Sequence, residues 1–333
     1  MLSVSLNDRY RLGRRLGAGG MAEVFRGTML GIEGFSRPVA IKRVLAGLSE
    51  QQVFSAMFIR EAQIAARLIH PNIVSVLDFS RDIHGRLFMV MEYVDGTDLA
   101  ALVETGPVPP SLAIFILSEM LRGLGYAHSG PADLAAPVIH RDVSPQNLLL
   151  SAEGAVKLAD FGLAKVRAVN DAVWPEDERG KPSYMAPEQI AGAGVALDGR
   201  CDLYAAGVML WELLAQRPLF TGTRREIFRQ ATFRDVVPPS RVRAGVAPDV
   251  EAVAMKLLAR DRAQRFATAR AAIDALLSCR DAPRDGRGEL VALLAERPRV
   301  RRGEPESELA VKWRLLCRSR ARKEAASRCV SPR

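Results

Sequence analysis

Short apolar segments, separated by glycine-rich or charged turns, fill the first third of the chain, and their spacing predicts strands. Five such segments carry the apolar positions expected of strands, at residues 11–16, 23–27, 39–42, 73–79 and 87–91. Residues 58–64, which read Phe-Ile-Arg-Glu-Ala-Gln-Ile, have the spacing of an amphipathic helix. We therefore expect a β-rich region with one helix between residues 10 and 92.

From residue 110 onward the apolar period becomes helical, which predicts a larger helical region. The most apolar stretch, residues 112–124, is interrupted by Ser118, Glu119 and Arg122 and is shorter than the ~20 residues of a membrane helix. It reads as a long buried helix. Residues 1–10 lack a charged leader with a following apolar stretch, so we predict no signal peptide and a cytoplasmic location.

Two polar clusters suggest chemistry. Residues 140–142 read His-Arg-Asp, Asn147 follows, and residues 160–162 read Asp-Phe-Gly. Phosphoryl transfer from ATP needs a carboxylate that positions and deprotonates a hydroxyl, and oxygen ligands that hold magnesium against the phosphates. This stretch supplies both.

Further motifs stand in a fixed order around these clusters. Residues 16–24 read Leu-Gly-Ala-Gly-Gly-Met-Ala-Glu-Val, and glycines there allow a hairpin to lie close over phosphates. The apolar segment 39–42 ends in a cation, Lys42, and Glu61 lies in the amphipathic helix. Later come Ala-Pro-Glu at residues 186–188, Asp202 and Arg265. Each motif alone has an ordinary structural explanation, but their joint order does not.

Together these residues resemble the protein-kinase catalytic core over roughly residues 10–277, and most closely the eukaryotic-like (Hanks-type) bacterial serine/threonine kinases. The resemblance implies an α+β, two-lobed fold with a small β-rich N-lobe and a larger helical C-lobe. It also implies pairing of Arg265 with Glu188. We expect a domain at residues 10–278, an extension at 1–9, and a basic tail at 279–333 with a short helix at 287–296.

The resemblance implies the role of each residue. Asp142 is the expected base, Asn147 and Asp160 hold Mg²⁺, and Lys42, oriented by Glu61, fixes the ATP phosphates. The residues expected to surround the nucleotide are Leu16, Gly17, Ala18, Gly19, Gly20, Met21, Ala22, Glu23, Val24, Ala40, Lys42, Met91, Glu92, Val94, Asp98 and Leu149. Among them, Val24, Ala40 and Leu149 are expected to sandwich the adenine ring, and Met91 is expected beside it. Residues 92–94 are expected at the hinge and Asp98 near the ribose.

One departure from the family pattern concerns a lysine. Ser/Thr kinases usually carry Lys two residues after the catalytic Asp and Thr after the glycine that precedes Ala-Pro-Glu. Here these positions are Ser144 and Lys181. We hypothesise that Lys181 supplies the ammonium group that Ser144 lacks; a solvent-facing lysine is the alternative.

The expected activity is transfer of the ATP γ-phosphate to Ser or Thr of protein substrates and of the kinase itself, because residues 144–145 do not match tyrosine-specific loops. A pseudokinase scaffold is the alternative, and Ser144 favours it. A small-molecule phosphotransferase fits less well because residues 186–188, Asp202 and Arg265 are typical of the peptide-docking lobe of protein kinases.

Composition adds limits. The four cysteines show no paired spacing and read as reduced thiols. The four histidines form no ligand cluster, and the resemblance implies that His140 packs beneath Phe161. Residues 280–333 carry 15 Lys and Arg against 8 Asp and Glu, a net charge of +7 within the chain's +9. Such a tail could bind an acidic partner or be a solvated extension; nucleic-acid binding is not assigned.

Residues 163–182 contain no Ser, Thr or Tyr. We predict that Asp171 or a carboxylate of residues 176–178 pairs with Arg141 in place of a phosphate, so that activity needs no phosphorylation of this loop. A solvated acidic run is the alternative. Phosphatase treatment should leave the activity of the purified protein unchanged. A sharp loss traced to a phosphosite near the loop, such as Ser183, would refute the prediction.

Overall fold

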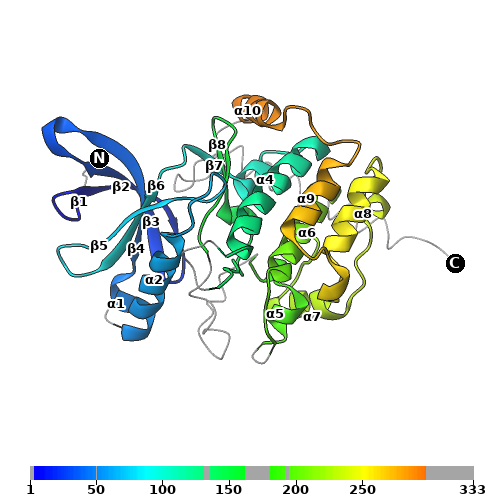
Figure 1. The fold of residues 1–333 in the computed structure, drawn as a ribbon, viewed down its shortest axis with the longest axis horizontal. Coiled ribbons are helices and arrows are strands. Elements are labelled where there is room, and N and C mark those ends of the chain that lie inside the picture. Colours follow the sequence, from blue (N-terminus) through cyan, green and yellow to red (C-terminus); the bar gives the residue numbers. More distant parts are fainter. Residues whose placement is uncertain (1–3, 50, 131–135, 162–180, 193–194, 298–333) are drawn as a thin grey trace.

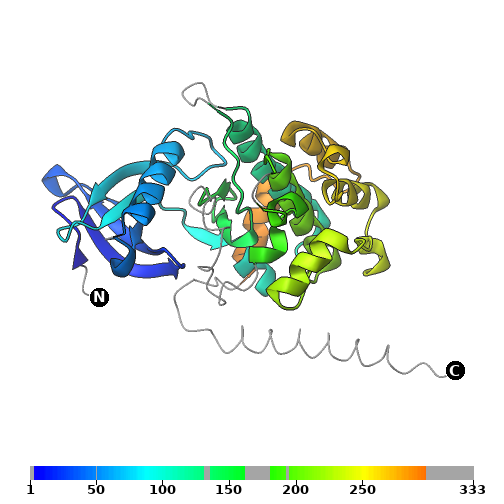
Figure 2. The ribbon, with the colours of Figure 1, turned by 90° about the horizontal axis from the view of Figure 1, so that it is seen from below.

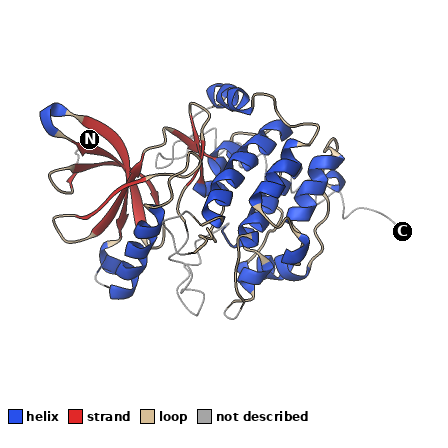
Figure 3. Cartoon of the chain, in the orientation of Figure 1, coloured by secondary structure: helices blue, strands red, loops and turns tan. Residues whose placement is uncertain are grey.

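The computed structural model describes residues 4–49, 51–130, 136–161, 181–192 and 195–297. Strands gather at one end of the molecule and helices at the other (Figures 1 and 3). The view turned by 90° keeps the same separation (Figure 2). The predicted α+β architecture with two lobes is therefore confirmed.

The N-terminal lobe is an antiparallel sheet with the strand order β1-β2-β3-β4-β6-β5. Its strands are β1 (Val4–Ser5), β2 (Tyr10–Ala18), β3 (Ala22–Leu30), β4 (Ser36–Val44), β5 (Val76–Arg81) and β6 (Leu87–Glu92). A 3₁₀ turn, η1 (Ile32–Gly34), joins β3 to β4, and the helices α1 (Ala46–Ser49) and α2 (Gln52–Ala65) follow β4. Five strands lie between residues 10 and 92 as predicted, and β1 adds a sixth before them.

One predicted strand starts later than expected. We predicted residues 73–79, but β5 begins at Val76 because the preceding residues pair elsewhere. Ile73 forms an isolated parallel bridge with Leu158, and the N–H of Val74 donates to the carbonyl of Leu158 at 2.9 Å. This segment therefore ties the N-terminal lobe to a strand of the second lobe.

Strand β6 is buried on both faces, since its side chains alternate between two apolar clusters. Phe88 and Val90 pack with β2 and β4 on one face. Leu87, Met89 and Met91 pack on the other face with Phe58 of α2. The second face is the one that α2 covers, and it turns toward the rest of the molecule (Figure 1).

The C-terminal lobe is built around two buried helices, α4 (Pro110–His128) and α6 (Arg200–Ala215). The predicted apolar helix at 112–124 is the centre of α4. Around this pair lie α3 (Leu99–Glu104), α5 (Pro187–Ile190), α7 (Arg224–Phe233), α8 (Pro248–Leu257) and α9 (Ala269–Leu277), with the 3₁₀ turns η5 (Pro239–Arg241) and η6 (Arg262–Gln264).

A small antiparallel sheet lies at the junction of the lobes (Figure 1). Its strands are β7 (Gly96–Asp98), β8 (Leu148–Ser151) and β9 (Val156–Leu158), and η2 (Pro145–Asn147) leads into β8. Since β7 follows the hinge and β9 ends just before Asp160, this sheet positions residues from both predicted polar clusters.

A last helix, α10 (Gly286–Glu296), packs beside β7, β8 and α4 (Figure 1). Leu290 is fully buried in the main core, and a Cβ on Gly286 would lie 2.5 Å from the Phe115 ring, so glycine permits the close approach. Arg287 Nε donates to the carbonyl of Glu153 at 2.8 Å. The short helix predicted at 287–296 therefore lies on the folded domain.

After α10, Arg297 donates to the carbonyls of Gly106 and Pro107, just past the end of α3. A cation at the C-terminal end of α3 also interacts favourably with the negative end of the helix dipole.

None of the described helices combines the length and the apolar character that a membrane span requires. Cys201 and Cys279 are buried free thiols. The expected partner binding by the basic tail falls on residues 298–333, outside the described residues.

Candidate active site

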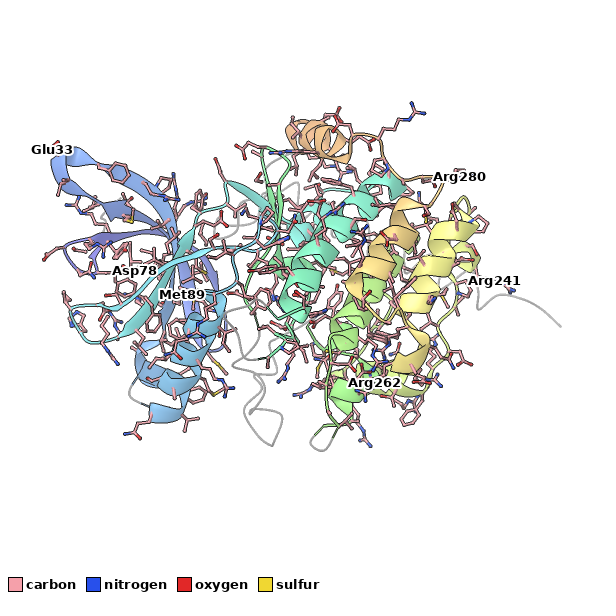
Figure 4. All side chains as sticks on the ribbon, in the orientation of Figure 1. Glu33, Asp78, Met89, Arg241, Arg262 and Arg280 are labelled. Atoms are coloured by element: carbon pink, nitrogen blue, oxygen red, sulfur yellow. The ribbon has the colours of Figure 1, made fainter. Side chains whose placement is uncertain are left out.

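The register of the N-terminal sheet places Lys42 on the face that turns toward the second lobe. Lys42 lies opposite Val24 on β3 and opposite Met89 on β6, which Figure 4 labels. Ala40, two residues earlier, lies opposite Met91 and therefore shares this face. The predicted phosphate-binding lysine and the predicted adenine-binding residues thus project in one direction.

Lys42 joins both lobes through two carboxylates. Its Nζ lies 2.7 Å from Glu61 Oε1 on α2 and 2.9 Å from Asp160 Oδ1 after β9. The side chains of Lys42 and Glu61 are only 15% and 8% exposed. Burial opposes the charge on Lys42, but the carboxylates of Asp160 and Glu61 outweigh it and raise its pKa above the usual value. Lys42 is therefore a firmly held ammonium.

Burial also opposes the charge on Glu61. Burial raises the pKa of Glu61, and the neighbouring ammonium of Lys42 opposes that rise. Loss of one partner would leave the other charge buried and alone, which typically costs ~3–5 kcal/mol. The contact that brings α2, β4 and Asp160 together is thus strongly coupled.

The segment that carries His140 and Asp142 is held by Asp202 of α6. The buried carboxylate of Asp202 accepts the backbone N–H groups of His140 and Arg141, each at 2.8 Å, and lies 2.8 Å from His128 Nε2. Arg141 has φ 66°, a left-handed conformation that non-glycine residues rarely adopt. Burial alone would raise the pKa of Asp202, but these hydrogen bonds hold it below its usual range.

The ring of His140 connects the two polar clusters. It packs against the Phe161 ring with a centroid distance of 4.5 Å and an angle of 40° between the ring planes, in agreement with the predicted contact. Nδ1 accepts the N–H of Asp142 at 3.3 Å, while Nε2 faces the carbonyl of Ala159 at 3.1 Å and so carries the proton. Burial lowers the pKa of His140, which keeps the ring neutral.

Hydrogen bonds connect Asn147 to Asp142 and to Ala159, the residue before Asp160. Asn147 Nδ2 donates to Asp142 O at 2.8 Å and to Asp142 Oδ2 at 3.2 Å, while Ala159 N donates to Asn147 O at 2.8 Å. This orientation leaves the side-chain oxygen of Asn147 for a cation. An amide oxygen and the partly exposed carboxylate of Asp160 are hard ligands that fit Mg²⁺.

The predicted glycine loop is the β2–β3 turn, where Gly19 N donates to Ala22 O at 2.9 Å. A Cβ on Gly17 would meet no atom within 4 Å, and one on Gly19 would meet only Ala22 O at 3.9 Å. Neither glycine has a positive φ. Packing within the protein therefore does not require glycine here, which fits a backbone that stays bare for a ligand. Glu23 is paired with Arg15 at 3.0 Å.

Four predicted adenine-site residues belong to one apolar cluster under the sheet: Met91, Ala40, Val94 and Leu149. Two polar residues of the same prediction have additional contacts. Asp98 is 3% exposed and its Oδ1 caps α3 by accepting from Ala101 N. The Glu92 side chain turns to Ser75 and Lys157. Contacts of Asp98 with a ribose and of the hinge with adenine stay predictions.

Ser144, two residues after Asp142, is a buried side chain whose hydroxyl lacks a hydrogen-bond partner among the described residues. It is 1% exposed. Lys181 begins the 3₁₀ turn η4 (Lys181–Tyr184), but its side chain lies outside the described part of the structure. The proposed exchange with Ser144 therefore stays a prediction. Asp171 and residues 176–178, which we expected to pair with Arg141, also lie outside the described part of the structure.

The segment after η4 is fixed by an arginine whose guanidinium uses all five N–H groups. Arg265 forms two hydrogen bonds with Glu188, at 2.6 and 2.9 Å, which confirms the predicted pair. The other three N–H groups donate to carbonyls of residues 200, 259 and 260. Gln189 Nε2 donates to Arg141 O at 3.1 Å and links this segment to Asp142.

Sequence reasoning missed two contacts near the site. Gln189 follows the Ala-Pro-Glu motif directly, but an amide gives no sign of its partner in sequence. Tyr184 donates its hydroxyl to Glu212 Oε2 of α6 at 2.7 Å, and Leu219 N donates to Glu212 Oε1 at 3.0 Å. These partners are 28 and 7 residues away, beyond the reach of local periodicity.

Comparisons with known proteins agree with this geometry. The family model described as "Protein kinase domain" matches residues 10–276. The serine/threonine-protein kinase PknB of Mycobacterium leprae is 39% identical over 270 residues, which are 79% of this chain and 42% of that protein. The tyrosine-protein kinase MasK of Myxococcus xanthus is 38% identical over 279 residues, 80% and 42% respectively.

A solved structure is also similar. The PknI kinase domain of Mycobacterium tuberculosis superposes with a TM-score of 0.60 at 30% identity, covering 82% of this chain and 96% of that one. The chain thus spans less than half of the curated relatives it matches but nearly all of a solved kinase domain.

Stability should depend on pH through Glu212. Burial raises the pKa of Glu212 to about 7, against weaker opposing effects of its two hydrogen bonds. Because the folded state binds the proton more tightly than the unfolded state, the destabilisation is absent below the ordinary pKa of 4.5, grows as pH rises toward 7 and is complete above 7. A shift of this size corresponds to a destabilisation on the order of 3 kcal/mol at most. In urea unfolding at pH 5 to 8, Glu212→Gln should gain stability over the wild type as pH rises. Exposed Glu104→Gln is the control; equal pH slopes for all three proteins would contradict the assignment.

Proposed function

The chain belongs to the protein kinase family, and on that premise we propose that it transfers the γ-phosphate of ATP to Ser or Thr hydroxyls of protein substrates and of itself. The observation that carries this proposal is the three-way contact of Lys42 with Glu61 and Asp160. It joins the predicted phosphate-binding cation to a predicted metal ligand across the two lobes. Use of ATP favours action in the cytoplasm.

In this proposal each residue has a separate task. Lys42 is held by Glu61 and orients the phosphates, while the β2–β3 turn covers them and excludes water. The apolar cluster with Met91 and Leu149 receives the adenine. Asn147 and Asp160 would hold Mg²⁺, which supplies positive charge against the phosphates.

Asp142 is the proposed base. Its carboxylate is oriented by Asn147 Nδ2, and its backbone N–H is held by the neutral ring of His140. An incoming hydroxyl that lies against Asp142 can give up its proton as its oxygen attacks the γ-phosphorus, while the bond from that phosphorus to the bridging oxygen breaks and ADP leaves. The left-handed backbone at Arg141, fixed by Asp202, determines where that carboxylate lies.

The acceptor class is a further part of the proposal. Residues 144–145 read Ser-Pro, unlike tyrosine-specific loops, and relatives named serine/threonine kinases support the same class. MasK, named a tyrosine kinase, is similar to nearly the same degree. The percentage of sequence identity does not separate relatives named serine/threonine kinases from one named a tyrosine kinase. The phosphorylated amino acid must therefore be identified directly.

A pseudokinase scaffold is the second candidate, and the buried Ser144 at a usual lysine position is the observation that favours it. A scaffold needs no intact pair between Lys42 and Glu61 and no carboxylate at 142. Retention of both charges despite the cost of burial supports catalysis instead.

Asp142→Asn should lower phosphate transfer by ~10²–10⁴-fold while nucleotide binding stays at the wild-type level, since the amide keeps the shape but accepts no proton. Labelled transfer from Mg-ATP to the protein itself and to a generic basic protein measures the rate, and acid hydrolysis identifies the labelled amino acid. Label on Ser or Thr that vanishes in the variant supports the proposal. A folded wild type that binds nucleotide and transfers nothing would favour the scaffold, and label on Tyr would reverse the acceptor class.

Lys181→Ala should reduce turnover by at least about tenfold at unchanged ATP binding, because it removes a cation that stabilises charge on the transferred group. Lys165→Ala, in the same segment of sequence, is the matched control and should retain activity. Ser144→Lys added to Lys181→Ala should then restore turnover. Normal turnover in Lys181→Ala would end the exchange hypothesis.

A further inference from the structure

The side chain of Glu92 connects three segments at the junction of the lobes. Glu92 is the last residue of β6, directly after Met91. Its Oε1 accepts the backbone N–H of Ser75 at 2.8 Å and lies 2.8 Å from Lys157 Nζ. The side chains of Glu92 and Lys157 are 22% and 18% exposed, so solvent screens this ion pair only partly.

Lys157 occupies a central place in the small sheet. It is the middle residue of β9 and lies directly opposite Leu149 of β8. Directly opposed residues project from the same face of an antiparallel pair, so Lys157 is a cross-strand neighbour of the predicted adenine floor. Asp160 follows three residues later.

Strand β9 is also fixed on its other edge. Leu158 N donates to Asn72 O at 2.8 Å, and Val74 N donates to Leu158 O at 2.9 Å. Asn72 Nδ2 donates to Val156 O at 3.0 Å and to Glu119 Oε2 of α4 at 2.8 Å. These bonds leave β9 little freedom relative to residues 72–75.

The bonds form a closed circuit. Residues 72–74 hold β9, Lys157 of β9 reaches Glu92, and Glu92 returns to Ser75. The circuit contains the start of the hinge and the strand that leads to Asp160. Its single charged cross-link is the pair of Lys157 and Glu92, so removal of the ammonium opens the circuit without changing any residue of the proposed catalytic set.

We propose that Lys157 is a positioning residue that, through Glu92, holds the hinge against β9 and thereby sets how long nucleotide stays bound. The inference rests on the proposed function, since it assigns the adenine to the space between hinge and β8. Without the ion pair, the hinge and the small sheet separate more readily, and the adenine loses its fixed walls. Bound nucleotide then leaves faster, while the groups around Asp142 stay in place.

Lys157→Met keeps the length of the apolar stem and removes the charge. Dissociation of fluorescent ADP, measured by stopped flow, should become about fivefold faster, as expected for a coupled contact pair. The KM for ATP should rise without a fall in kcat. Lys157→Arg should restore the wild-type ADP rate, because a guanidinium still reaches Glu92.

Two further comparisons isolate the pair. Lys256→Met, which removes a lysine packed on Phe266 in the C-terminal lobe, should leave ADP dissociation unchanged. Glu92→Gln should speed dissociation, and adding it to Lys157→Met should bring little further change. Wild-type dissociation rates in folded Lys157→Met, or a lower kcat at an unchanged rate, would overturn the inference. If wild type itself bound no ADP, the proposed function would fail instead.

Discussion

A single buried carboxylate, Asp202, sets the conformation around which the candidate site is arranged. It accepts backbone N–H groups from His140 and Arg141 and contacts His128, so three residues from two segments meet on one side chain. The left-handed backbone of Arg141 needs such support, since a non-glycine residue there is strained. Asp142 follows immediately, and its position is inherited from α6, the most completely buried helix of the lobe.

The N-terminal lobe contributes through charge, whereas the C-terminal lobe contributes through backbone geometry. Lys42 reaches Asp160 from a strand whose register is fixed on both sides, and α2 adds Glu61. Buried charges of this kind add little net stability, because desolvation offsets their attraction. They instead specify one relative arrangement of the lobes, in which the phosphate-binding cation and the metal ligand coincide.

Residues that act through motif order could be predicted from sequence, and residues that act through long-range contacts could not. Motif order identified three contacts that the structure contains: Lys42 with Glu61, His140 with Phe161, and Arg265 with Glu188. The predicted start of β5 at residue 73 was wrong, because Ile73 and Val74 pair with Leu158 rather than with β6. The partners of Glu92 and Glu212 have no sequence signal, because a carboxylate on a strand or helix is compatible with solvent and with burial alike.

The contacts of Arg297 fix the end of α10 on the domain. Its guanidinium donates to carbonyls just past the end of α3, and Arg287 donates to the carbonyl of Glu153, so α10 is held near both of its ends. A molecule bound to the chain just after this point would be tethered to the domain. The length of the connecting chain, rather than the bulk concentration, would then set how often that molecule meets the kinase.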